Sequence, residues 1–337
     1  MTKRLLRSSP LKFTLPLLAG MMLLSPVALA INEDSIKISG DSPEFARLID
    51  THAASELLSA DSAWSEGPQC LTDGRLIWSD VRGNKVMSWK EGEKAKVWIA
   101  KSDFQNGHTL DKQGRLIAAS HGKRGILRQE KDGEWTLLVD SYQGGKLNSP
   151  NDLTLAADGA IWFTDPTFGL NSKAEGYGGK QEQDGEYIYR FDPETKALTR
   201  MKTPEVGSPN GLAFSPDGKK LYIADSQLAH DFKSKTLNHR IAVYDVVKNQ
   251  LQNGRVFADI TDGIPDGLAV DTLGNLWSSS KHGILVFSAA GKQIGHLAVP
   301  AKDTSNLTFC QSGKQNWLYV TASEKVFRLP VRVAGAL

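Results

Sequence analysis

The sequence repeats one pattern six times between residue 61 and its C-terminal end. Each copy has a polar residue eight positions before a glycine, and a strand-like apolar run follows the glycine. Successive copies begin 39 to 59 residues apart, which is near the length of a propeller blade, so a length of 337 residues does not require two domains. The six segments run from Glu66 to Gly74, Asn106 to Gly114, Asn151 to Gly159, Asn210 to Gly218, Asp266 to Gly274 and Ser305 to Gly313.

Each copy is typical of four short strands separated by turn residues. In the third and fourth copies, residues 166–185 and 226–238 interrupt the pattern, and we expect them to form loops. The sixth copy has only three strands. Segment 55–60 can supply the fourth, which would close the ring and remove its open edge. The sequence therefore predicts an all-β, six-bladed β-propeller with an N-terminal strand closing the last blade. A β-sandwich would give no reason for six equivalent units.

The first thirty residues have the features of a secretory signal. A basic stretch ending at Lys12 precedes the apolar run 13–24, and Ala28 and Ala30 form a small-residue cleavage site. The apolar run spans roughly 18 Å, too short for a hydrocarbon core of ~30 Å. We expect a signal peptide (1–30) cleaved after Ala30 and an N-terminal extension with the closing strand (31–60). Residues 61–337 would then form the catalytic propeller of a periplasmic or secreted protein.

The charge of the mature chain gives no general basis for binding nucleic acid or a membrane. The sequence has 40 Lys and Arg against 38 Asp and Glu, and four of the basic residues lie in the signal segment, which has no acid. The remainder is therefore slightly acidic, which disfavours both kinds of anionic partner. The sequence does not indicate an oligomeric state. The expected partner is a small molecule.

Two cysteines, Cys70 and Cys310, follow the signal segment. An oxidising compartment permits a disulfide between them. However, Cys70 lies four residues after Glu66, whereas Cys310 lies five residues after Ser305. Strict alternation along a strand would put them on opposite faces, which is poor geometry for a bridge. The expectation is therefore two buried free thiols.

The polar residue that opens each copy is a candidate site residue. The first strand of each propeller blade lines the central channel, so the residue that opens it lies near one mouth. Positions two and four further on are mostly apolar, as expected beneath a polar ring. Segments 166–185 and 226–238 leave from the same face and are expected to overhang this mouth. The predicted ring consists of Glu66, Asn106, Asn151, Asn210, Asp266 and Ser305.

Two carboxylates and three amides around one axis favour a metal ion. Buried carboxylates are costly without a cation, and no Lys or Arg occupies a ring position. Oxygen donors without thiolates favour Ca²⁺, with Mg²⁺ and Mn²⁺ as alternatives. Asn106 and Ser305 fit a second role equally well, as caps that bond backbone groups where blades meet. For Glu66 and Asp266, metal binding is the favoured interpretation.

Five short motifs occur in order, each in its expected copy of the repeat. They are Ser65–Pro68, Asn148–Asp152, Trp162–Pro166, Ser208–Leu212 and Pro265–Leu268. Each motif alone would be weak evidence. Together they resemble the senescence-marker-protein/gluconolactonase (regucalcin-like) family, and the resemblance extends from Trp64 to about Leu329. It implies a six-bladed propeller, lactone hydrolysis and one divalent cation in the channel, commonly Ca²⁺, with Mg²⁺, Mn²⁺ or Zn²⁺ as alternatives.

The resemblance also implies roles for individual residues. The implied metal ligands are Glu66, Asn151, Asn210 and Asp266. Asp266 is further implied as the catalytic carboxylate, acting as base or nucleophile, and Asn106 as a substrate-binding residue. His121 and His282 are expected near second-strand ends on this face, where a solvated turn histidine is the favoured interpretation and contact with the substrate the alternative. Of the two, His121 is the second substrate-binding candidate, at a place where many bacterial members have Glu-His and this chain has Ser-His. Ser149 stands where animal members carry arginine, so the substrate is less defined than the metal.

These observations predict a metal-dependent lactonase, a carboxylic ester hydrolase that opens a sugar lactone. The cation would polarise the carbonyl group and stabilise the developing oxyanion, while Asp266 acts as base or nucleophile. One alternative is phosphotriester hydrolysis at the same site. A non-catalytic exported propeller that binds a ligand is another, although it has no need of an acidic metal ring. The fold alone does not choose among them.

Overall fold

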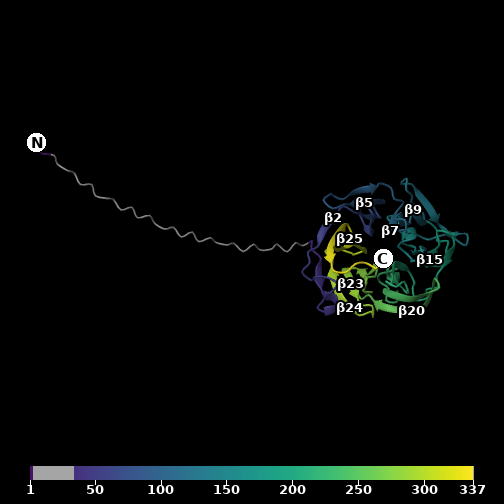
Figure 1. Cartoon of the computed structure of the whole chain (residues 1–337). Coiled ribbons are helices and arrows are strands. Elements are labelled where there is room, and N and C mark those ends of the chain that lie inside the picture. The colour runs from purple at the N-terminus through teal and green to yellow at the C-terminus, as the bar shows by residue number, and fades with distance from the viewer. Residues whose placement is uncertain (3–33, 337) are drawn as a thin grey trace. The chain divides into compact units, whose positions relative to one another are not determined.

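The computed structural model describes residues 1–2 and 34–336, so the predicted signal peptide lies almost entirely outside the described residues. Residues 34–336 lie in one compact unit. Six antiparallel sheets of this unit stand around a central axis as blades of a propeller (Figure 1). The predicted all-β, six-bladed fold is therefore confirmed. No helix among the described residues is long and apolar enough to cross a membrane.

The first three blades each contain four strands in chain order. Blade 1 consists of β3 (Ser65–Cys70), β4 (Leu76–Asp80), β5 (Lys85–Trp89) and β6 (Lys96–Ile99). Blade 2 consists of β7 (Gln105–Leu110), β8 (Leu116–Ser120), β9 (Gly125–Gln129) and β10 (Trp135–Val139). Blade 3 consists of β13 (Leu153–Leu155), β14 (Ile161–Asp165), β15 (Tyr187–Phe191) and β16 (Leu198–Arg200). A small hairpin, β11 (Ser141–Tyr142) and β12 (Gly145–Lys146), precedes blade 3.

Blade 4 also has four strands in chain order, whereas blades 5 and 6 each take one strand from the N-terminal extension. Blade 4 consists of β17 (Pro209–Phe214), β18 (Lys220–Asp225), β19 (Arg240–Val247) and β20 (Gln250–Asp259). Blade 5 consists of β21 (Leu268–Val270), β22 (Leu276–Ser280), β23 (Gly283–Phe287) and β24 (Gln293–Ala298), with β1 (Lys37–Ser39) added outside. Blade 6 consists of β25 (Asn306–Ser312), β26 (Gln315–Ala322), β27 (Lys325–Val331) and β2 (Glu56–Ser59). Short helical turns are α1 (Pro43–Ala46), α2 (Phe168–Asn171) and η1 (Gln227–His230).

Strand β2 closes the ring as the sequence predicts. It pairs antiparallel with β27, with Glu56 opposite Arg328. The extension does more than close blade 6, because Phe45, Leu48 and Ile49 are fully buried in a core shared with blades 5 and 6. Residues 34–60 are therefore an integral part of the propeller's outer wall.

The hydrophobic core lies between neighbouring blades. The second strands of blades 1, 2, 3 and 5 are buried at every position, because a neighbouring blade covers each of their faces. Trp78, Trp162 and Trp277 lie in three of these strands and are fully buried. This packing fixes how the blades are oriented about the axis.

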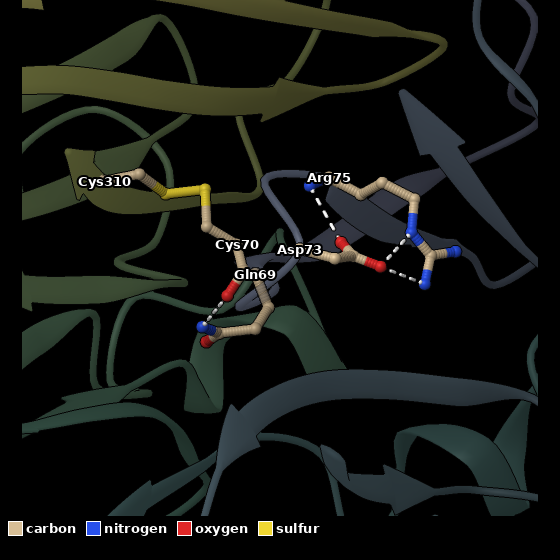
Figure 2. Close-up of a disulfide and its surroundings, with 5 residues drawn as sticks. All are labelled: Gln69, Cys70, Asp73, Arg75 and Cys310. Carbon is tan, nitrogen blue, oxygen red and sulfur yellow. Dashed lines mark hydrogen bonds and ion pairs between the residues drawn. A yellow bond between two sulfur atoms is a disulfide. The ribbon is translucent and has the colours of Figure 1, made fainter. Parts of the chain in front are cut away.

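Cys70 and Cys310 form a disulfide that joins blade 1 to blade 6, with 6.2 Å between their Cα atoms (Figure 2). The expectation of free thiols was wrong because the first strand is not regular. In β3, Glu66 pairs with Ser79 but Gln69 pairs with Ile77, so one extra residue is accommodated between them. That bulge shifts the alternation by one position and turns Cys70 toward Cys310.

The C-terminal end of the chain lies near the centre of the ring (Figure 1). Ala336 donates its backbone N–H to the carbonyl of Val270, 2.8 Å away. Ala336 also lines a small cavity of about 100 Å³ that contains His108, Asp152 and Asn306. The C-terminal residues thus contribute to one end of the channel. Ala336, His108, Asp152 and Asn306 do not line the larger cavity of the candidate active site.

Candidate active site

Four of the six ring positions are followed directly by glycine, and two of these glycines show why. Gly67 has a φ of +50°, and a Cβ at this position would lie 2.0 Å from the carbonyl oxygen of Asn106. A Cβ on Gly211 would lie 2.2 Å from the carbonyl oxygen of Asp266. Only glycine permits these close approaches between neighbouring inner strands.

Backbone hydrogen bonds run from blade to blade at these glycines. Gly107 donates its N–H to the carbonyl of Asn151 over 2.8 Å, and Gly211 donates to that of Asp266 over 2.9 Å. Each bond ties the residue after one ring position to the ring residue of the next blade. The ring side chains converge because the backbone that carries them is drawn together.

Five of the six predicted ring residues line one cavity of about 1010 Å³: Glu66, Asn106, Asn151, Asn210 and Asp266. They come from β3, β7, the approach to β13, β17 and the approach to β21. Both predicted loops also reach this cavity, one through α2 and the residues after it, the other through η1 and Phe232. Five of the six predicted ring residues and both predicted loops therefore meet at one cavity.

Ser305 does not line this cavity. Its Oγ lies 2.6 Å from the carbonyl oxygen of Ser65 and 3.0 Å from that of Thr321, so it joins blade 6 to blade 1. This is the capping role that the sequence left open for Ser305. The neighbouring residue Asn306 faces the channel, and its amide donates to Asp152 over 3.4 Å.

Sequence reasoning missed Asp152 and Asn306 as channel residues. The signal was present, because they occupy the position after the ring residue where the other four blades have glycine. A Cβ on Gly107 would lie 2.4 Å from Asp152 Oδ1, and one on Gly267 would lie 2.2 Å from Asn306 Oδ1. Two of the glycines therefore make room for the two side chains that replace glycine in blades 3 and 6.

Three carboxylates near the axis are hard to ionise in the structure as it stands. Burial raises the pKa of Glu66, and the negative charge of Asp152 adds to the shift. Burial likewise raises the pKa of Asp266, with Glu66 and Asp152 as further causes. Burial raises the pKa of Asp152 to about 6. This cluster of acids would be stabilised by a positive charge on the axis.

His121 lies behind two ring amides and does not form part of the cavity wall. Its Nδ1 donates to the carbonyl of Glu175 over 2.8 Å, since a carbonyl can only accept. Burial lowers the pKa of His121 and keeps the ring neutral, so Nε2 is an acceptor. The amide nitrogens of Asn106 and Asn151 each lie 3.4 Å from Nε2.

This arrangement orients both amides. Because their nitrogens face His121, the oxygens of Asn106 and Asn151 point the other way. The oxygen of Asn106 is buried and accepts no hydrogen bond from the described residues. The structure therefore leaves at least one amide oxygen without a donor beside the acidic axis.

The donor set is made of oxygen atoms. Asn210 donates a side-chain hydrogen bond to Asp266, so these two ring residues also touch. Within residues 34–336, no group of three His, Cys, Asp or Glu side chains has a metal-binding arrangement. A cation held here would instead use two carboxylates together with amide oxygens.

The central part of the chain, residues 64–324, matches the family model described as "SMP-30/Gluconolactonase/LRE-like region". The gluconolactonase of Zymomonas mobilis is 29% identical over 326 residues, covering 89% of this chain and 87% of that protein. The pentonolactonase XacC of Haloferax volcanii is 25% identical over 264 residues, covering 77% and 81%.

Solved structures agree with this result. A gluconolactonase from Xanthomonas campestris is 37% identical, with a TM-score of 0.78 over 88% of this chain and 95% of that one. A regucalcin from Agrobacterium tumefaciens, described as a calcium-binding protein, has a TM-score of 0.66 over 83% of this chain and 95% of that one. Its identity is 19%, so this second likeness bears on the fold alone.

Proposed function

Because the chain belongs to the SMP-30/gluconolactonase/LRE-like family, we propose that it is a metal-dependent hydrolase that opens a sugar lactone. The observation that carries the proposal is the convergence of Glu66, Asn151, Asn210 and Asp266 on one cavity. Relatives named gluconolactonase and pentonolactonase supply the substrate class.

The residues present fit a hard divalent cation. Two buried carboxylates with raised pKa values need a positive charge, and the unpartnered oxygen of Asn106 is a further acceptor beside them. Oxygen donors of this kind favour Ca²⁺, with Mg²⁺, Mn²⁺ and Zn²⁺ as alternatives. Glu66, Asn151, Asn210 and Asp266 would hold the ion, which would polarise the lactone carbonyl and stabilise negative charge on its oxygen.

The chain's own residues perform the remaining steps. Asp266 either accepts the proton of the attacking water or attacks the carbonyl carbon directly. Asn106 lines the same cavity, which supports a role in contacting the substrate. The aromatic side chains of Trp64, Phe168 and Phe232 form apolar parts of the wall and exclude water around the reacting group.

A lactone panel read by acid release, with and without a chelator, tests this proposal. We expect hydrolysis of gluconolactone-type substrates, loss of activity with chelator, and recovery on adding back Ca²⁺. Lactone hydrolysis that a chelator leaves unchanged would contradict the metal. Activity on a phosphotriester alone would favour the alternative hydrolase, and metal binding without either activity would favour a ligand-binding propeller.

We also propose that the protein is exported. The signal pattern in residues 1–30 supports this, and so does the disulfide, because such bonds persist mainly in oxidising compartments. N-terminal sequencing of protein recovered from the periplasm or medium should begin at Ile31. Protein that retains Met1 and stays in the cytoplasm would contradict export.

Replacing His121 with leucine should weaken calcium binding by about 10–100-fold, the usual loss when a group that orients metal ligands is removed. The leucine cannot accept from the amides of Asn106 and Asn151, so their oxygens lose their fixed direction. Titration calorimetry with Ca²⁺ on the folded protein measures the effect.

The glutamine variant of His121 and a second buried histidine serve as controls. His121→Gln keeps an acceptor oxygen and should retain most of the affinity. His108 is also buried, but it bonds the carbonyl of Gly67 and the side chain of Gln105. His108→Asn should lower stability without changing calcium affinity. Unchanged affinity in His121→Leu would show that His121 does not orient the amides.

A further inference from the structure

The two long loops of blades 3 and 4 meet at the cavity mouth. Phe168 begins α2 on the first loop and His230 ends η1 on the second. Their rings lie 5.4 Å apart with an interplanar angle of 33°. Both side chains line the cavity that contains Asp266 and Asn210. His230 is therefore a titratable group on the wall of the proposed active site, and the function described so far does not use it.

One nitrogen of His230 is held by a buried polar cluster. Its Nε2 lies 3.1 Å from Glu186 Oε1 and 3.2 Å from Ser208 Oγ. Glu186 also accepts hydrogen bonds from Ser208 and from Thr167, the latter over 2.5 Å. The side chain of Glu186 is 11% exposed, whereas that of His230 is 31% exposed. The carboxylate is thus enclosed while the imidazole reaches the cavity.

The other nitrogen, Nδ1, has no hydrogen-bond partner among residues 34–336 and is free to meet a ligand. Burial opposes ionisation of Glu186, but hydrogen bonds from His230, Ser208 and Thr167 outweigh it and lower its pKa. The hydrogen bond to Glu186 in turn raises the pKa of His230. The pair therefore favours the imidazolium form of His230 more than solvent alone would, and in that form Nε2–H is bound and Nδ1–H is available.

We propose that His230 is the general acid of lactone opening, donating the Nδ1 proton to the ring oxygen as it leaves, with Glu186, Ser208 and Phe168 holding the imidazole in place. This inference rests on the proposed lactonase function. Ring opening releases an alkoxide, which is a poor leaving group unless it is protonated as the bond breaks. His230 supplies this proton from the same cavity that holds Asp266.

When Asp266 acts as the base, ring opening conserves every atom and charge. The water oxygen bonds to the carbonyl carbon and gives one proton to Asp266, leaving a negative charge on the former carbonyl oxygen. That charge returns to reform the carbonyl, the bond to the ring oxygen breaks, and its electron pair stays with the ring oxygen. The ring oxygen takes the Nδ1 proton. Asp266 then releases its proton to solvent and His230 regains one, so one water has been added.

The test compares variants at saturating Ca²⁺ on gluconolactone, after subtraction of spontaneous hydrolysis. His230→Gln should lower kcat by about 10²–10⁴-fold, the usual contribution of a general acid, with KM and calcium affinity nearly unchanged. His282 is a matched control, because it also pairs with a carboxylate (Asp262, 3.3 Å) but does not line the cavity. His282→Gln should keep wild-type activity.

The pH profile separates a catalytic role from a structural one. Activity requires protonated His230, so kcat should fall as pH rises through its pKa, which Glu186 raises. The other neighbours are the neutral Ser208 and Phe168, and Glu186 is the charged group that faces the ring. Glu186→Gln should therefore move the basic limb of the profile to lower pH. This shift is measurable even if His230→Gln folds poorly.

Three results would overturn the inference. The first is a His230→Gln variant whose kcat stays close to wild type, and the second is a loss confined to KM. The third is a basic limb that Glu186→Gln does not move. Wild-type protein that hydrolyses no lactone would overturn the proposed function together with this step, whereas active wild type with active His230→Gln would overturn this step alone.

Discussion

Replacing Asp266 with asparagine should lower lactone hydrolysis by about 10²–10⁴-fold, and added Ca²⁺ should not restore it. The asparagine keeps the size of the side chain and one oxygen ligand, so metal binding persists at raised concentration. The substitution removes the carboxylate that we propose acts on water or on the carbonyl carbon. Steady-state rates with gluconolactone across a Ca²⁺ series measure the loss.

Glu66→Gln is the matched variant, because it removes the other carboxylate of the ring and keeps Asp266, the proposed catalytic one. We expect weaker Ca²⁺ binding, with activity partly recovered at excess metal. The contrast separates the two carboxylates, which line the same cavity and share raised pKa values. Full activity in metal-loaded Asp266→Asn would show that Asp266 is neither the base nor the nucleophile.

Replacing both Cys70 and Cys310 with serine should lower the free energy of unfolding by about 2–5 kcal/mol, the usual cost of removing a native disulfide. The loop that this bond closes is long, since the cysteines are separated by 240 positions in the sequence. The unfolded chain therefore gains much freedom when the bond is absent. Denaturant titration of oxidised wild type and the variant measures the change.

Asp73→Asn is a control from the same surroundings. Asp73 pairs with Arg75 near the disulfide (Figure 2), but its side chain is 51% exposed, and such pairs contribute about 0–1 kcal/mol. Wild type in reducing agent should match the double serine variant. Equal stability of wild type and double variant would show that packing between blades 1 and 6 holds the ring without the bond.

The fold could be predicted because the residues that determine each blade lie close together in the sequence of every repeat. A turn glycine, a buried second strand and a polar opening residue recur in the six blades, and each depends on neighbours a few residues away. The convergence of Glu66, Asn106, Asn151, Asn210 and Asp266 follows from that equivalence alone. Strand β2 was predictable for a related reason, since the last repeat lacks a strand.

The features that the sequence did not predict depend on departures from the repeat. The bulge at Gly67 shifts the alternation of β3, and this shift determines where Cys70 points. The backbone of Ser305 bonds the second strand of its blade as that of Asn151 does, but the short hydroxyl of Ser305 bonds backbone carbonyls and does not reach the larger cavity. The position of His230 depends on the conformation of an irregular loop and on its meeting with a second one. Such contacts leave no periodic trace in a sequence.

The two closures of the ring also constrain when the protein can fold. Strand β27 (Lys325–Val331) pairs with β2 (Glu56–Ser59), and Cys310 must find Cys70, so both closures join late-synthesised residues to early ones. Neither can form while the last blade is still inside the ribosome. Contacts between such distant residues also form slowly. A chain of this design stays open throughout its synthesis, and this open state would suit the export proposed above, in which the chain passes through a secretion channel before its ring is sealed.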